Sequence, residues 1–284
     1  MVTVPAEALA PFPRVSRYNS PYPAHDAGAA VDLYPAGEVA PSPVAGEVVE
    51  TRTVACPSRP YAADNDHLIV VDTGTHLARI LHVSPGVDPG ETVAVGDSLG
   101  TLVRSGYFAP WVDNHVHLGF RDHGTNAVRA TGSLPLSLDA PIEAVPWDGT
   151  GRVVETGETY AILDAPAHPD PGTVYAGIAD DSGAFALDGG MPHYEWGGRL
   201  ATGERDGPKS PDGGGDEEPV HFLGERVGDA TSEPVRWRDV TVRANGDPVL
   251  GLSFFLGREE LYAKVIDRNH SLAVGDDVVV ALDG

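Results

Sequence analysis

The feature that most constrains the fold is the shortness of the apolar runs. They are rich in valine, isoleucine and leucine, as at residues 68–71, 153–154 and 278–280. The 284 residues include 34 glycines and 25 prolines, which disfavour helix interiors and supply turns between strands. No long amphipathic helical pattern is visible. The sequence therefore predicts a mostly β protein.

The strand-like segments predict two β modules. We expect a first domain at residues 14–124, a connection at 125–146 and a second β-rich domain at 147–284. Residues 203–219 are charged and glycine-rich with no apolar anchor, which predicts a flexible acidic loop. Within the first domain, the predicted strands cover residues 30–34, 46–50, 68–72, 77–83, 92–95, 99–103 and 112–120.

Two short sequences occur twice, in the same order. The sequence Gly-x-Val-Val-Glu-Thr stands at residues 46–51 and 151–156, and Ala-Val-Gly-Asp stands at 94–97 and 273–276. This repetition predicts that the second domain is a degenerate copy of the first. The alternative is chance recurrence among common residues.

The net charge of −23 is spread along the chain, and only Lys209 and Lys264 are lysines. A dispersed acidic surface that uses arginine almost exclusively is typical of proteins from salt-rich, halophilic cells, where self-repulsion is screened. An ordinary acidic protein is the alternative. Either interpretation makes nucleic acid and anionic membrane surfaces poor partners.

Cysteine usage and the N-terminus indicate the compartment. Cys56 is the only cysteine, so no disulfide forms within the chain. Residues 1–13 show neither a basic region nor a long apolar segment, so we expect no secretory signal. No apolar run reaches membrane-spanning length. We therefore expect a cytoplasmic protein.

The candidate site rests on His115 and His117, which flank a single valine. In a β-strand residues i and i+2 point to the same face, so the two imidazoles should project together. Asp32 lies in an otherwise apolar strand, where an unpaired buried carboxylate would be costly. With His25 upstream, these side chains suit a metal site. Histidines that merely occupy a strand are the alternative.

Four stretches in this order resemble the motifs of the lysostaphin-type zinc metallopeptidases, family M23. They are residues 25–35 (HDAGAAVDLYP), 41–50 (PSPVAGEVVE), 80–100 (ILHVSPGVDPGETVAVGDSLG) and 114–120 (NHVHLGF). The resemblance implies the duplicated hybrid motif, a barrel-sandwich-like β fold, in the first domain. It also implies a zinc cofactor and hydrolysis of peptide bonds in a peptide or protein substrate.

The same resemblance assigns roles to individual residues. It implies that His25, Asp32 and His117 bind zinc and leave a fourth position for water, as in catalytic zinc sites. His82 and His115 would lie beside the metal as catalytic residues, moving a proton and stabilising the oxyanion.

The chain departs from the family pattern at two positions. The family histidine four residues before the aspartate is replaced by Gly28, so His25 reaches the metal only if residues 26–29 bulge or loop. The family glutamate after the second histidine is replaced by Arg121. The family acts mostly on bacterial cell walls after export. Without an export signal, we expect an intracellular peptide or protein substrate instead of peptidoglycan.

Two other classes of function are alternatives. A non-catalytic binding or assembly protein could retain the duplicated hybrid motif scaffold. A biotinyl or lipoyl carrier needs an exposed lysine on a hairpin, but Lys209 lies in the predicted loop and Lys264 lacks a comparable hairpin signal. The carrier is therefore disfavoured. The sequence does not indicate which oligomeric state the protein adopts.

Overall fold

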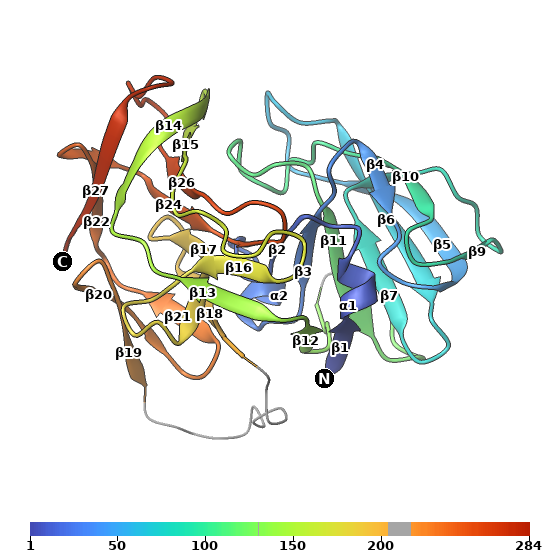
Figure 1. Cartoon of the computed structure of the whole chain (residues 1–284). Helices are drawn as coiled ribbons and strands as arrows, with labels where there is room; N and C mark the ends of the chain where they lie inside the picture. Colours follow the sequence, from blue (N-terminus) through green and yellow to red (C-terminus); the bar gives the residue numbers. More distant parts are fainter. Residues whose placement is uncertain (130, 204–216) are drawn as a thin grey trace. The chain divides into compact units, whose positions relative to one another are not determined.

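The computed structural model describes residues 1–129, 131–203 and 217–284, and most of its regular structure is β-strand (Figure 1). Within these ranges the two α-helices are single turns, α1 (Ala6–Leu9) and α2 (Pro23–Asp26). The predicted mostly β class, with two β-rich domains, is confirmed. Most of the predicted acidic loop at 203–219 lies outside the described residues. No helix in the described ranges is long and apolar enough to cross a membrane.

Contacts divide the chain into two compact units. The first comprises residues 1–15 and 27–140, and the second comprises residues 16–26 and 141–284. The first unit includes β1 (Val2–Pro5) and β12 (Leu136–Asp139), which pair in parallel. The predicted domain boundaries at 14–124 and 147–284 stay predictions.

The strands of the N-terminal half are short and mostly antiparallel. Beyond β1 and β12, they are β2 (Arg14–Ser16), β3 (Val31–Tyr34), β4 (Val39–Pro41), β5 (Gly46–Ala55), β6 (Asn65–Asp72), β7 (Leu77–Leu81), β8 (Val83–Pro85), β9 (Thr92–Val93), β10 (Ser98–Leu102) and β11 (Val116–Arg121). The order β3-β11-β7-β6-β5-β9 forms the main sheet of the first unit, and β4-β10-β8 forms a smaller one.

Two predicted strands are interrupted, and both interruptions lie at the candidate site. The expected strand at 77–83 divides at His82, whose φ of +68° breaks the extended backbone between β7 and β8. The expected strand at 112–120 begins only at Val116, so His115 lies immediately before β11. A left-handed residue between two extended segments turns the chain, which periodicity alone does not reveal.

The described residues of the second unit include fifteen strands. They are β13 (Ile142–Val145), β14 (Thr150–Gly157), β15 (Tyr160–Leu163), β16 (Tyr175–Ile178), β17 (Phe185–Met191), β18 (Trp196–Ala201), β19 (Glu218–Phe222), β20 (Glu225–Ala230), β21 (Pro234–Trp237), β22 (Thr241–Ala244), β23 (Asp247–Val249), β24 (Gly251–Phe254), β25 (Leu256–Gly257), β26 (Ala263–Ile266) and β27 (Asp277–Asp283). Twelve of them form one sheet in the order β19-β20-β21-β18-β17-β24-β26-β15-β14-β27-β22-β23.

The repeated sequences adopt similar local structures. Strands β5 and β14 both have a register irregularity within the repeated Val-Val-Glu sequence. In the turns at 94–97 and 273–276, the aspartate side chain accepts a hydrogen bond from the backbone N of the alanine, at 2.8 Å in each. The strand pairing around the two turns differs. Strand β5 pairs with β9, which precedes the turn at 94–97, whereas β14 pairs with β27, which follows the turn at 273–276. The two sequences therefore specify the same turn and bulge within different strand arrangements.

Phe254 lies in the aromatic core of the second unit. It is buried, and its ring centroid lies 5.3 Å from that of Phe222 and 6.5 Å from that of Trp237. We expect Phe254→Ala to lower the free energy of unfolding of this unit by about 3–5 kcal/mol, because it removes buried apolar area and leaves a cavity. Guanidinium denaturation followed by tryptophan fluorescence measures the change. Val279→Ala, at an exposed valine, is the control, and equal effects of the two substitutions would contradict this prediction.

Candidate metal centre

Asp32 and His117 are brought together by strand register. They are directly opposed on the antiparallel strands β3 and β11, so their side chains lie on the same face. His117 Nδ1 lies 2.9 Å from Asp32 Oδ1, and the carboxylate is buried. A metal ion could be coordinated by the same nitrogen and oxygen atoms, in place of the proton that they share in the hydrogen bond.

His25 lies in a local turn of the kind that its spacing from Asp32 requires. It lies in the single helical turn α2, and Gly28 then takes a φ of +60°, a conformation that favours glycine. The buried His25 ring donates its Nδ1–H to the carbonyl oxygen of Arg17 at 2.6 Å. Nε2 of the neutral ring therefore keeps a lone pair. Histidine ligands of metals are commonly oriented in this way, by a hydrogen bond from the other ring nitrogen to a backbone carbonyl.

The segment that holds this carbonyl is anchored by Asp188 of β17. The buried Asp188 carboxylate accepts hydrogen bonds from Ser16 Oγ at 2.5 Å and from the backbone N of Arg17 at 2.6 Å. Burial raises the pKa of Asp188 to about 6, although these hydrogen bonds and the Arg17 charge oppose the shift. The position of the Arg17 carbonyl is thus fixed by a carboxylate far away in the sequence.

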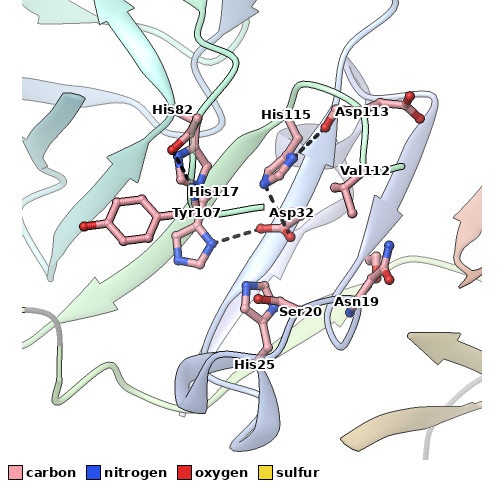
Figure 2. A network of polar contacts seen from close by, with 12 residues as sticks. Asn19, Ser20, His25, Asp32, His82, Tyr107, Val112, Asp113, His115 and His117 are labelled. Atoms are coloured by element: carbon pink, nitrogen blue, oxygen red, sulfur yellow. Dashed lines mark hydrogen bonds and ion pairs between the residues drawn. The ribbon is translucent and has the colours of Figure 1, made fainter. Parts of the chain in front are cut away.

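His25, Asp32 and His117 form a group that could hold a metal ion. One ligand atom from each lies within 4.8 Å of the others. Figure 2 shows dashed lines from His117 and from His115 to the Asp32 carboxylate. Two imidazole nitrogens and one carboxylate oxygen are a donor set that suits zinc, with room in its preferred coordination for a fourth ligand. The structure thus brings together the three residues expected to bind metal.

His115 lies beside this group and is buried. Its Nδ1–H donates to the Asp113 carbonyl oxygen at 2.8 Å, and its Nε2 lies 3.5 Å from Asp32 Oδ2. Burial lowers the pKa of His115 to about 4; the Asp32 charge opposes this shift, and His82 and His117 add to it. The ring is therefore neutral at neutral pH, with an Nε2 lone pair directed toward the cluster. A neutral acceptor in this position suits a base.

His82 completes the set of histidines at the site. Its ring centroid lies 5.0 Å from that of His115 and 5.7 Å from that of His117. Its Nδ1 is 2.6 Å from Oδ2 of the buried Asp66. Burial alone would raise the pKa of Asp66, but hydrogen bonds from His82, Ser105 and the His67 backbone hold that pKa below its ordinary value.

Sequence reasoning missed several residues that support the site. Asp66 had a visible signal, because the alternation of β6 places it on the same face as the buried Leu68 and Val70. Asp188 showed no comparable signal. Arg121, at the position of the family glutamate, is buried and donates to Ser133 Oγ and to backbone carbonyls, so it anchors the segment after β11 and lies outside the donor set.

The two halves of the chain match the two models of one protein family. Residues 3–138 match the DUF8155 N-terminal domain, and residues 143–283 match the DUF8155 C-terminal domain; both are described as domains of unknown function. The chain belongs to the DUF8155 family. Its two β-rich domains correspond to these two matches.

Other comparisons add little to the DUF8155 assignment. No curated protein matches the chain. Among solved structures, the antimicrobial peptidase lysostaphin from Staphylococcus simulans is similar at 15% identity, with 98% of each chain covered and a TM-score of 0.27. A TM-score this low does not establish a shared fold. The chemistry of this DUF8155 protein is therefore best judged from its own residues.

Proposed function

We propose that this protein is a zinc-dependent hydrolase of peptide bonds, similar to the M23 peptidases. The observation that carries the proposal is the convergence of His25, Asp32 and His117 within 4.8 Å. Two further buried histidines lie beside them. A structural metal site is usually closed by four protein ligands, whereas three ligands with adjacent acid–base groups are typical of hydrolytic zinc sites.

In this proposal the three ligands would hold zinc, which would supply Lewis acidity and lower the pKa of a water molecule. The neutral His115 would accept a proton from the attacking water at Nε2, since its Nδ1–H is already donated to a carbonyl. The ring centroid of His82 lies 5.0 Å from that of His115, and His82 would donate a hydrogen bond to the developing oxyanion when its Nε2 carries a proton. The substrate class is a peptide or protein.

A second candidate function is a non-catalytic binding or assembly protein. It is favoured by one observation, which is that His117 and Asp32 already satisfy one another by a hydrogen bond. In that case the cluster would be a polar network that stabilises the N-terminal unit and holds no metal. The two candidates differ in metal content and in turnover.

Metal binding provides the direct test. We expect one zinc per chain by elemental analysis, and we expect a chelator to lower the melting temperature until zinc is restored. A ligand at 100 times its Kd stabilises the folded state by about 2.7 kcal/mol, so the shift should be readily measured. His123→Ala is the matched control, because this histidine pairs with Asp72 at an exposed position.

Hydrolysis should then be measured on peptide libraries with and without zinc, at low and at molar salt. Zinc-dependent cleavage supports the peptidase. One bound zinc without turnover on any peptide favours the binding protein. Absence of zinc binding in wild type would refute the proposed metal centre.

A further inference from the structure

We propose that Asp66 is a positioning residue that holds His82 in one orientation and one tautomer, so that Nε2 is the atom His82 uses in the reaction. This inference rests on the function proposed above and adds to it a buried aspartate–histidine pair. Asp66 does not belong to the metal-ligand group, and its carboxylate accepts hydrogen bonds from His82.

The Asp66 carboxylate is buried and accepts four hydrogen bonds. Two of them come from His82, from its backbone N to Oδ1 at 3.1 Å and from Nδ1 to Oδ2 at 2.6 Å. The others come from the backbone N of His67 at 2.7 Å and from Ser105 Oγ at 2.7 Å. One carboxylate therefore holds both the main chain and the ring of His82.

The backbone of His82 supports the same inference. Its φ of +68° lies in the left-handed region, which a residue with a Cβ seldom adopts. Such conformations persist where the surroundings impose them, and they cluster at functional sites. Here Asp66 fixes the His82 backbone N, and the backbone N of Val103 donates to the His82 carbonyl oxygen at 2.8 Å.

The hydrogen bonds also determine which ring nitrogen remains for chemistry. A carboxylate only accepts, so the 2.6 Å contact places the proton of the neutral His82 ring on Nδ1. Nε2 then keeps its lone pair, and the His82 ring forms T-shaped pairs with the rings of His115 and His117. A histidine held in this way can exchange a proton at Nε2 without reorienting.

The tautomer is measured directly by nitrogen-15 NMR of the histidine side chains in zinc-loaded wild type. We expect His82 to show a proton on Nδ1 that exchanges slowly and resonates far downfield. Asp66→Asn should remove this signal, because the amide presents an N–H group of its own to the ring. A wild-type His82 protonated at Nε2 would overturn the proposal, whatever the activity.

The second readout is kinetic. Asp66→Asn should lower kcat by about 10–100-fold, the usual effect of losing a group that orients an active-site residue, and should change the pH dependence of kcat. KM and zinc content should remain as in wild type. Asp72→Asn is the matched control, because Asp72 lies on the same strand and pairs with the exposed His123 at 2.8 Å.

The remaining outcomes separate the two proposals. Ser105→Ala removes one donor to Asp66 but keeps both contacts with His82, so it should retain the tautomer even if Asp66→Asn does not fold. An unchanged kcat and pH profile in Asp66→Asn would overturn the positioning role. Absence of turnover in wild type would refute the peptidase, and the NMR signal would still decide whether Asp66 fixes His82.

Discussion

Replacing His117 by alanine should abolish both zinc binding and peptide hydrolysis. His117 supplies one of three ligand nitrogen or oxygen atoms within 4.8 Å, and two remaining ligands hold zinc weakly. The substitution also removes the 2.9 Å hydrogen bond between His117 and the buried Asp32, so the local hydrogen bonding and packing will change. Elemental analysis and a chromogenic zinc competitor measure the metal, and peptide cleavage measures the activity.

Two controls keep this result interpretable. His117→Gln preserves a polar side chain of similar size, and circular dichroism establishes that the variant is folded. His76→Ala removes a histidine outside the cluster and should leave one zinc per chain. Stoichiometric zinc in a folded His117→Ala variant would show that the ligand set is assigned wrongly.

Replacing His115 by alanine should instead spare the metal and remove hydrolysis. Its Nε2 is 3.5 Å from Asp32 Oδ2, and its Nδ1 is committed to the Asp113 carbonyl, so its proposed role is proton transfer. Loss of a general acid–base group lowers the rate by about 10²–10⁴-fold. We expect kcat to fall by this factor while zinc stoichiometry stays at one.

The comparison of the two variants is more informative than either alone. Metal loss in His115→Ala equal to that in His117→Ala would mean that His115 is also a ligand. Full activity in His115→Ala would transfer the proposed base role to His82. The ring of His115 packs against Phe108, with centroids 4.7 Å apart, so Phe108→Leu controls for loss of packing near the site.

Some of the site follows from local sequence patterns. The two-residue period of a strand predicts a common side for His115 and His117, and both contact Asp32, although His115 lies just before β11. Asp32 is conspicuous because it interrupts an apolar strand that is otherwise suited to burial. Short apolar runs between glycine and proline turns were sufficient to predict the β class, since they allow strands and exclude long helices.

The cytoplasmic location, the halophilic interpretation and the absence of nucleic-acid and membrane partners stay predictions. They rest on the acidic composition and on the sequence of residues 1–13. The resemblance to M23 peptidases gave the residues of the metal cluster by number. It gave no account of the residues that hold these side chains in place.

What the sequence determined by itself is the β class and the proximity of chemical groups that lie one or two positions apart. What only the tertiary structure decided is how distant segments meet. Asp66 holds His82 across 16 positions, and Asp188 fixes the Arg17 carbonyl that orients His25 across 171. Strand periodicity relates only residues that are close in the sequence. The hydrogen-bond donors of a buried carboxylate, in contrast, come from whichever segments the topology places beside it.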